Sequence, residues 1–260
     1  MKNKLIILSL FLLSSCDFTS VVNKEILHAQ ELADNKQYEE AAAVYEKVLN
    51  STVKPNVKTR IYFHLSELYT SFIPNIDKAI ENYKKVLEID VEPIWHVKSM
   101  EKIASIYYEF KKDYPQAIFY YKKLIQYYPP LENYDEYVVK ILSALTELKN
   151  IDEFEKFVKD NKLSKNAKVA VKLDWYYGLI YFYNQQWMNA INRWKNYLKY
   201  EKDADSIVRA KFFLANSYEM VEMLREAYNV YYSILNEYPN KEVIQSRLES
   251  LYARRAARKR

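Results

Sequence analysis

The sequence predicts an all-α protein built from a repeated pair of helices. Only one glycine occurs among the 260 residues, whereas β-hairpins and bulges need glycine at their turns. The stretch 177–198, YGLIYFYNQQWMNAINRWKNYL, shows the repeated unit. Its second half places Trp187, Ala190 and Trp194 on one helix face, and its first half carries a stripe of its own. We therefore expect two short antiparallel helices that cross where Gly178 and Ala190 let the backbones approach.

The unit can be counted along the chain by the small residue of its second helix, called here the second-helix mark. The marks Ala41, Ala79, Ala117, Ala190 and Ala227 are spaced 38, 38, 73 and 37 residues apart, so the long gap hides one more unit near Phe154. Large side chains stand three residues before and four residues after each mark: Tyr38, Ile76, Tyr114, Ile151, Trp187 and Leu224 before it, and Tyr45, Tyr83, Tyr121, Val158, Trp194 and Tyr231 after it. Small residues also recur in the first helices, at Ala29, Ser66, Ala104, Gly178 and Ala215. This pattern predicts about six helix pairs, or about twelve antiparallel helices.

The pattern resembles the tetratricopeptide repeat (TPR). The fifth repeat matches that family through Gly178, Tyr181, Trp187, Ala190 and Trp194, and the sixth repeat through a similar set that ends in Pro239. The resemblance implies a right-handed solenoid, which we expect over residues 23–252. The period exceeds the usual ~34 residues, which indicates longer helices or connections. The fourth repeat departs most from the family pattern, because Phe154 replaces the alanine.

The first residues predict export and a lipid anchor. Lys2 and Lys4 precede the apolar run Leu5–Leu13, which is too short to span a membrane. Leu13-Ser14-Ser15-Cys16 resembles a bacterial lipobox and implies cleavage of a signal peptide (1–15), diacylation of Cys16 and a tether over 16–22. The alternative is an ordinary secretory signal with an incidental cysteine. The expected location is the cell envelope, with the protein facing the periplasm. Asp17 resembles an inner-membrane retention signal of enteric bacteria, and the choice of inner or outer membrane stays open.

The basic charge of the chain is concentrated at its C-terminus. Five basic residues lie in the segment 253–260, which we expect to form a basic tail: Arg254, Arg255, Arg258, Lys259 and Arg260. Without these residues and the two lysines of the signal peptide, the chain has 32 basic and 34 acidic residues. The tail is suited to anionic lipid headgroups or an acidic partner, or is a solvated, frayed helix end.

The motifs of common enzyme and metal sites are missing from the sequence. His28, His64 and His96 lie in different units and form no metal-binding pair, and a single glycine excludes phosphate-binding loops and nucleophile elbows. The body of the chain carries no basic excess for nucleic acid. We therefore expect no enzyme activity, no cofactor, no metal, no nucleic acid and no small-molecule substrate.

The candidate site is a groove lined by the first helices, because the TPR resemblance implies a concave surface there that binds peptides or partner segments. Bases recur six residues before the first-helix small residue, and large side chains lie beside them. The predicted groove residues are Arg60, Phe63, Lys98, Lys172, Trp175, Phe182, Tyr183, Arg209, Phe212 and Asn216. Such a surface suits a partner segment with carboxylates and one or two apolar anchors. The alternative is that the cations only solvate helix starts and the aromatic residues belong to the core.

The resemblance implies a non-enzymatic adaptor or assembly factor of the cell envelope. TPR lipoproteins of this layout include the pilotins of type IV pili, which assist secretins, and BamD-like proteins of outer-membrane β-barrel assembly. The expected partners are therefore envelope proteins such as secretin or β-barrel assembly subunits. Alternatives are a regulator or scaffold for motility or peptidoglycan hydrolases, and a structural scaffold that associates with itself.

Overall fold

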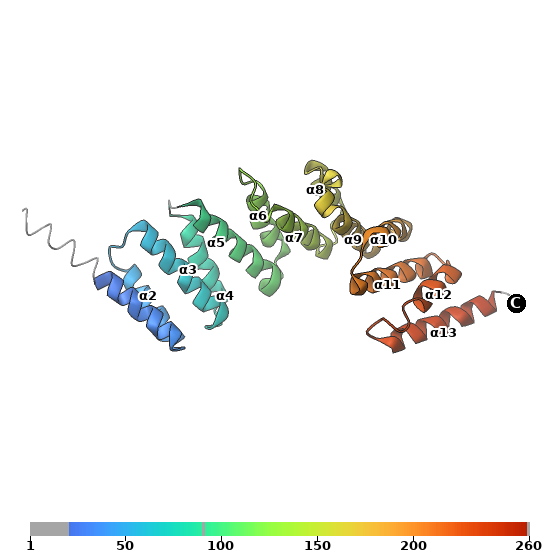
Figure 1. Ribbon diagram of the computed structural model, residues 1–260, viewed down its shortest axis with the longest axis horizontal. Helices are drawn as coiled ribbons and strands as arrows, with labels where there is room; N and C mark the ends of the chain where they lie inside the picture. The colour runs from blue at the N-terminus through green and yellow to red at the C-terminus, as the bar shows by residue number, and fades with distance from the viewer. Residues whose placement is uncertain (1–20, 90–91, 259–260) are drawn as a thin grey trace, which may run out of the picture. The chain divides into compact units, whose positions relative to one another are not determined.

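A computed structural model describes residues 21–89 and 92–258, and within these ranges every regular element is a helix (Figure 1). The predicted all-α class is therefore confirmed. The chain divides into two compact units, which we describe separately. Unit 1 ends at Lys112 and unit 2 begins at Asp113.

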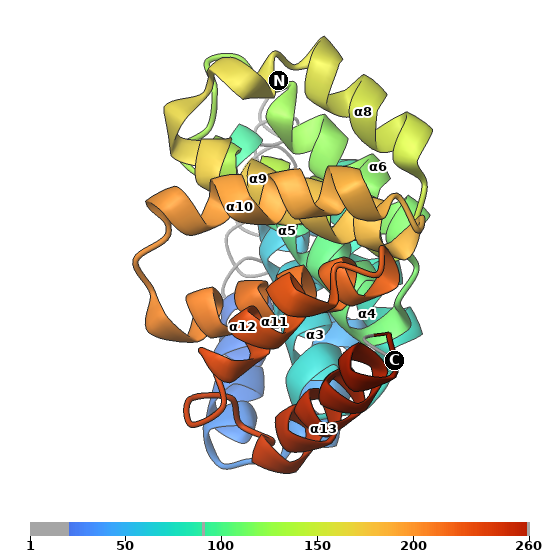
Figure 2. The ribbon, with the colours of Figure 1, turned by 90° about the vertical axis from the view of Figure 1, so that its right-hand side faces the viewer.

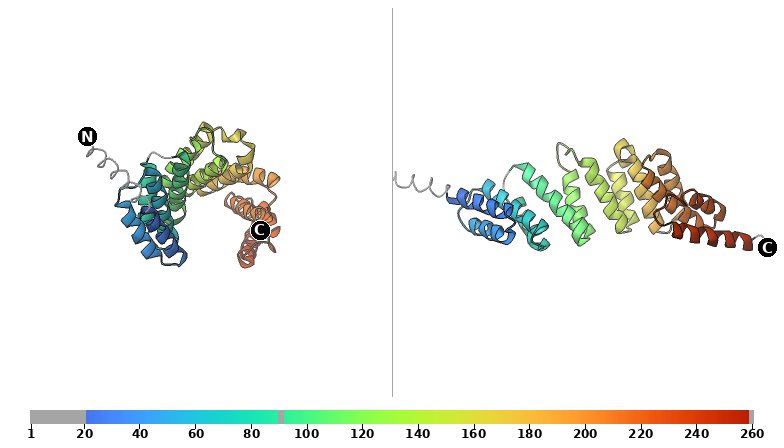
Figure 3. Two further views of the ribbon diagram at one scale, coloured as in Figure 1. Left: turned by 60° about the vertical axis from the view of Figure 1, so that its left-hand side comes forward. Right: turned by 60° about the horizontal axis from the view of Figure 1, so that its bottom comes forward.

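Unit 1 is a stack of helices in which each helix packs on the next one along the chain. The elements are a first helix over 21–34, α2 (Tyr38–Leu49), α3 (Pro55–Ser71), α4 (Ile76–Leu87), α5 (Pro93–Ile106) and a π-helix, η1 (Tyr107–Lys111). Helix α3 packs between α2 and α4, and α4 packs against α5 (Figure 3). Two of these helices start with a proline, a residue whose fixed φ favours the first helical position and whose missing N–H is not needed there.

Unit 2 continues the same pattern over a longer stretch. Its elements are α6 (Tyr114–Ile125), α7 (Tyr134–Glu147), α8 (Ile151–Asp160), the short 3₁₀-helix η2 (Leu163–Lys165), α9 (Ala167–Tyr183), α10 (Trp187–Tyr200), α11 (Ala204–Met220), α12 (Leu224–Tyr232) and α13 (Lys241–Ala257). Figure 2 shows α9 beside α10 and α11 beside α12. The last helix, α13, packs on α12 and has no following partner in the described chain.

The second helices start where the sequence predicts. Each of the six begins at the large residue three positions before its mark, from Tyr38 in α2 to Leu224 in α12. All six marks are completely buried, and Phe154 is buried like the alanines. The fourth repeat is therefore a true helix pair, α7 and α8, in which Phe154 takes the mark position. Leu142, also fully buried, stands in the first helix of this pair, where the other pairs have a small residue.

The turns inside the pairs repeat as well. Five of the six turns place a non-glycine residue with φ between 54° and 65° five positions before the mark: Lys36, Lys112, Lys149, Gln185 and Glu222. The sixth has Pro74 at this position, where the ring forbids a positive φ. At Gln185 the turn is a Schellman motif, with Gln186 N donating to Tyr181 O at 2.8 Å and Gln185 N donating to Phe182 O at 3.0 Å. The chain thus closes these helices without the glycine that usually adopts this conformation.

The π-helix η1 accommodates one extra residue. Eight positions separate the small residue Ala104 from Lys112, whereas seven separate Gly178 from Gln185. A single inserted residue inside a helix commonly widens one turn into a π-helix, and η1 lies between Ala104 and Lys112. The irregular length of this repeat is therefore absorbed within its first helix, and the turn geometry after it is kept.

Candidate functional site

Three predicted groove residues of unit 2 meet around one ring. Trp175 of α9, Phe182 of α9 and Phe212 of α11 are all half-buried, and their ring centroids lie 6.2, 5.3 and 6.0 Å from that of Phe213. Trp175 also packs edge-on against the buried Trp194 at 5.3 Å. Each of the three side chains is thus partly covered by core residues and partly exposed, and Phe212 also stacks on Tyr238 at 4.7 Å. The aromatic residues therefore contribute to the core and keep an exposed part, and their role in partner binding stays a prediction.

Two predicted cations border this aromatic surface, which we call the α9–α11 face. Arg209 is exposed on α11, and its guanidinium carbon lies 5.8 Å from the ring centroid of Trp175. Its Nη2 donates a hydrogen bond to Ser206 Oγ at 3.3 Å. Lys172 is exposed one turn before Trp175 on α9 and lies at a cavity of about 380 Å³ that Lys168, Asp135 and Glu136 also line. Arg209, a cation beside an aromatic ring, suits a carboxylate that arrives with an apolar group, whereas Lys172 shares its cavity with two carboxylates of this chain.

Tyr183 and Asn216 are held by local contacts. Tyr183 is exposed at the end of α9, where Lys149 Nζ lies 5.6 Å from its ring centroid, and burial of part of the phenol raises its pKa. Asn216 is half-buried, and its Nδ2 donates to Phe212 O at 2.9 Å, one helical turn earlier. One of the two N–H donors of the Asn216 amide is therefore used within its own helix.

The predicted groove residues of unit 1 do not form an equivalent aromatic surface. Phe63 is only 7% exposed and packs edge-on against Tyr83 and Trp95, at 5.3 and 5.4 Å between centroids. It is a core residue, so its assignment to the groove was wrong. Lys98 is exposed on α5, and its Nζ lies 5.5 Å from the ring centroid of Trp95. Arg60 is exposed on α3 at the mouth of a separate cavity.

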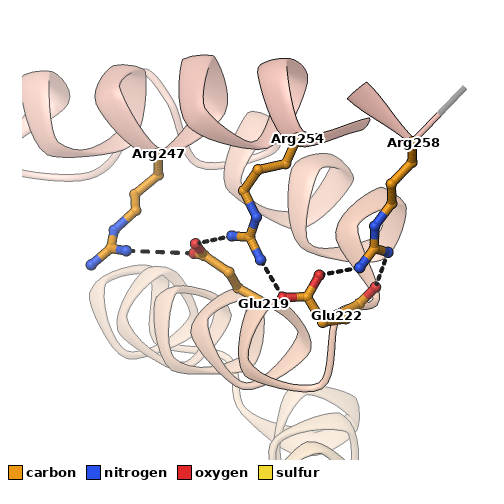
Figure 4. Close-up of polar contacts among 5 residues, drawn as sticks. All are labelled: Glu219, Glu222, Arg247, Arg254 and Arg258. Atoms are coloured by element: carbon orange, nitrogen blue, oxygen red, sulfur yellow. Dashed lines mark hydrogen bonds and ion pairs between the residues drawn. The ribbon is translucent and has the colours of Figure 1, made fainter. Parts of the chain in front are cut away.

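The C-terminal segment forms an arginine–glutamate cluster that sequence reasoning missed (Figure 4). Arg254 of α13 donates from Nη1 to Glu219 Oε1 at 2.9 Å and from Nη2 to Glu222 Oε1 at 2.5 Å. Arg258 pairs with the other oxygen of Glu222, and Arg247 Nη1 lies 3.6 Å from Glu219 Oε2. Helix α13 continues to Ala257, and two of the five basic residues assigned to a free tail are bound to carboxylates. The spacing of about one repeat between Glu219 and Arg254 is the signal that was available.

A second buried polar group links α9 to α10. Asp174 is 8% exposed and accepts a hydrogen bond from Arg193 Nη1 at 2.9 Å and another from Asn196 Nδ2. The guanidinium of Arg193 also covers the ring of Tyr177 at 4.0 Å. Because both oxygens of Asp174 are engaged, this group holds the helix pair together and offers no free base.

Residues 21–89 and 92–258 hold no group of three or more His, Cys, Asp or Glu side chains placed to bind a metal. None of the helices in the same part of the chain is long and apolar enough to cross a bilayer. Cys16, the predicted lipidation site, lies outside the described residues.

Two stretches of the chain match the tetratricopeptide repeat. Family models described as tetratricopeptide repeat match residues 59–90 and 98–130. This class of repeat is typically a non-enzymatic scaffold for protein–protein interaction. A comparison with curated proteins found no similar sequence.

Solved structures share the fold at low sequence identity. PilW, described as a widely conserved type IV pilus biogenesis factor, has a TM-score of 0.52 and 15% identity, with 87% of this chain and 97% of PilW covered. A structure of Naa15/Naa10 bound to HypK-THB has a TM-score of 0.64 and 17% identity, with 93% of this chain and 36% of that chain covered. Pseudomonas aeruginosa PilF has a TM-score of 0.49 and 13% identity, with 91% of this chain and 98% of PilF covered.

Proposed function

We propose that this protein is a non-enzymatic adaptor, anchored by lipid in a bacterial cell envelope and facing the periplasm, that holds a protein partner near the membrane. The observation that carries the proposal is the α9–α11 face. Exposed edges of Trp175 and Phe212 supply apolar contact there, and Arg209 and Lys172 supply positive charge. Half-buried aromatic residues beside arginine are typical of the residues that dominate protein–protein binding.

The chemistry of the face selects the kind of segment that binds. Among the described residues Arg209 forms no ion pair, although Asp203 lies near enough to interact with it electrostatically, so its remaining N–H donors are available to a carboxylate of the partner. An apolar side chain of the same segment covers the ring edges of Trp175 and Phe212. We therefore expect a partner segment that has an acidic residue close to an aromatic or aliphatic one.

The membrane location is supported by the N-terminal sequence. A basic start, an apolar run and Leu13–Cys16 match the pattern of a lipoprotein signal. Two acyl chains hold a protein stably on a bilayer. An adaptor tethered in this way meets a partner of the same membrane at a raised effective concentration, so that moderate affinity is sufficient.

A secretin or a β-barrel assembly subunit is the first partner to test. Both follow from the layout of a lipobox and tandem repeats. The shared fold with PilW, a pilus biogenesis factor by its description, supports testing the secretin first. The envelope-regulator and self-association alternatives are tested by the same experiment.

The adaptor role is tested by affinity purification of the lipidated full-length protein from detergent-solubilised envelopes, with mass spectrometry of the proteins that co-purify. We expect an envelope partner that is lost with Arg209→Glu and with Trp175→Ala. Arg225→Glu, at an exposed arginine of α12 outside the face, is the matched control and keeps the partner. Circular dichroism shows whether each variant is folded. A preparation that contains only copies of this protein contradicts the adaptor role and favours a self-associating scaffold.

The anchor is tested by metabolic labelling with a palmitate analogue. We expect label on the wild-type protein, a mature N-terminus at Cys16 and recovery in the membrane fraction. Cys16→Ala loses the label and leaves the membrane fraction, whereas Ser14→Ala, which keeps a small residue, behaves like the wild type. A wild-type protein without label in the soluble periplasmic fraction contradicts the anchor.

A further inference from the structure

A cavity of about 340 Å³ lies in unit 1 between the first helix, 21–34, and α3. Four aliphatic side chains line it: Ile26 and Leu27 from the first helix, and Val57 and Ile61 from α3. This volume falls at the small end of the range for ligand pockets, about 300–1,000 Å³. It therefore suits one side chain or a small molecule and excludes a large cofactor. We call it the Arg60 cavity, after the cation at its mouth.

Two stacked rings contribute to the wall of the Arg60 cavity. Tyr45 is 3% exposed, and its ring stacks on that of His64 with 6.3 Å between centroids and 14° between planes. Burial raises the pKa of the Tyr45 hydroxyl and lowers the pKa of the His64 imidazole. Both rings are therefore uncharged near neutral pH, and the interior of the cavity is a neutral, largely apolar surface.

The only full positive charge of the lining is Arg60. This residue is exposed on α3, and no acidic side chain forms an ion pair with it among the described residues. The nearest carboxylate on the same helix, Glu67, is already paired with Lys102 at 3.4 Å and lies 4.0 Å from His64. A guanidinium without a partner beside an apolar hole is complementary to a carboxylate attached to an apolar group.

We propose that the Arg60 cavity binds one leucine-sized side chain of a protein segment whose carboxylate pairs with Arg60. The apolar side chain enters between Ile26 and Ile61, and the carboxylate stays at the mouth, where water and the guanidinium solvate it. The proposal rests on the adaptor function, and it adds an anchoring site in unit 1 to the α9–α11 face of unit 2. The carboxylate comes from an acidic side chain next to the leucine or from a chain end.

The test is a titration of the full-length protein, labelled at its isoleucine, leucine and valine methyl groups, followed by NMR. The probe is a capped hexapeptide, Gly-Ser-Leu-Glu-Ser-Gly, with two control peptides in which Leu is replaced by Ala or Glu by Gln. We expect the methyl signals of Ile26, Val57 and Ile61 to shift with the probe and to need at least about tenfold more of either control peptide, because each control lacks one of the two interactions. Equal shifts with the Ala peptide overturn the proposal.

Three variants assign the interaction to the cavity. Arg60→Gln removes the charge and weakens binding about tenfold or more. Lys58→Gln removes a charge from the same helix outside the lining, and leaves binding unchanged. Val57→Phe fills the cavity, keeps Arg60, and abolishes the shifts. Binding that survives both Arg60→Gln and Val57→Phe overturns the proposal.

Further ligands separate the sources of the carboxylate. Stronger binding of a peptide that ends in a free leucine than of the same peptide with an amidated end identifies a chain end as the source. Binding of the capped hexapeptide identifies an acidic side chain as the source. N-acetyl-leucine that binds while no peptide does would overturn the protein-segment proposal. Failure of the adaptor function is distinguishable, because it appears as a lack of captured partner while the hexapeptide still shifts the methyl signals.

Discussion

At the crossing of α9 and α10, the indole of Trp194 fills the space that a Cβ on residue 178 would need. A Cβ built at Gly178 would lie 2.7 Å from two atoms of that ring. The other well-formed pairs combine Ala or Ser in the first helix with Tyr in the second, as Ser66 does with Tyr83. Glycine at 178 is therefore explained by the size of its partner and not by backbone conformation, since no glycine of the described chain has a positive φ.

We predict that Gly178→Ala destabilises the protein by about 1–2 kcal/mol. Alanine improves helix propensity by up to about 1 kcal/mol, but overpacking a buried site costs about 1–3 kcal/mol. The side chain of Trp194 has little room to move away from the added methyl group, because it is completely buried and stacks on Phe213 with 5.4 Å between ring centroids. Urea denaturation followed by circular dichroism measures the effect.

A double variant isolates the cause. In a Trp194→Tyr background, Gly178→Ala should cost nothing or should stabilise, which corresponds to a coupling energy of at least about 1 kcal/mol. An alanine variant as stable as the wild type, or the same loss in both backgrounds, would show that the indole is not the obstacle.

At a turn residue with left-handed backbone conformation, we predict that a substitution stabilises the protein, in contrast to Gly178→Ala. Gln185 has φ 59° and its side chain is exposed. A residue with a Cβ is strained in this conformation by about 1–2 kcal/mol, whereas glycine adopts it freely at some cost in unfolded-state entropy. Gln185→Gly should therefore stabilise by about 0.5–1 kcal/mol in thermal or urea unfolding. Its neighbour Gln186 has φ −86°, so Gln186→Gly is the control and should give no gain.

His64 predicts a pH dependence of stability. Its pKa lies below the ordinary value of about 6.5, first because burial disfavours the imidazolium, and further because Arg60 is near, with Glu67 opposing. The unfolded state therefore binds the proton first as the pH falls. The contribution of His64 to stability is therefore fully present above about pH 6.5, and it is lost as the pH falls from there to the folded-state pKa of His64. His64→Gln should flatten urea unfolding curves measured across this window, and His28→Gln, at an exposed residue, should not.

Among the elements, α13 depends on one buried carboxylate. The side chain of Glu219 is only 10% exposed, and it relies on Arg254 at 2.9 Å and on the more distant Arg247. Glu222 is about half exposed and pairs with Arg254 and Arg258. Glu219 therefore depends more on its arginine partner than Glu222 does. A buried carboxylate loses its hydration and needs the partner, whereas water solvates an exposed one.

We predict that Arg254→Met destabilises by about 1–3 kcal/mol, because it leaves the carboxylate of Glu219 with a single distant partner. Arg258→Met, which affects only the exposed Glu222, should cost less than about 1 kcal/mol. Chemical denaturation at low and high salt measures both, and salt should weaken only the Arg258 contribution appreciably. Equal losses from the two variants would contradict the ranking by burial.

The start and packing of the second helices were predictable because their signals are local. A large residue, a small one and another large one at fixed spacing lie within eight consecutive positions, as in Trp187–Trp194. The exposure of the first helices was not predictable in this way. Phe63 and Trp175 hold equivalent positions, yet Tyr83 and Trp95 cover Phe63, while Trp175 keeps an exposed edge. The covering residues come from other helices, and their size does not follow from the spacing.

The α13 cluster was missed for a related reason. Five basic residues in the last eight positions are typical of a free tail when they are read alone. Their partners, Glu219 and Glu222, lie more than 30 residues earlier, and only the packing of one repeat on the next brings them together. Contacts between repeats therefore decide which charged and aromatic residues remain free for a partner, and this is the part of the candidate site that needed the structure.

At the scale of the whole molecule, the chain consists of two compact units whose helices pack mainly on their neighbours in sequence. In such proteins stability is close to a sum of repeat and nearest-neighbour terms, so a local defect spreads only as far as coupling between repeats allows. A destabilising change in one unit should then loosen that unit first. Gly178→Ala is suited to this test, because its effect arises from one helix pair inside unit 2.

We predict that Gly178→Ala speeds amide hydrogen exchange in α9, α10 and α11 and leaves exchange in α2–α4 of unit 1 unchanged. Mass spectrometry of peptic fragments from wild type and variant, at equal pH and temperature, gives the two sets of rates. The reciprocal control is Ser66→Leu, which overpacks the fully buried small position of α3 and should speed exchange only in unit 1. Uniform acceleration in both units by either variant would show that the chain opens as one cooperative body. A response confined to the mutated unit would mean that the Arg60 cavity and the α9–α11 face lie on parts that open separately, so that a partner bound at one site stabilises that part alone.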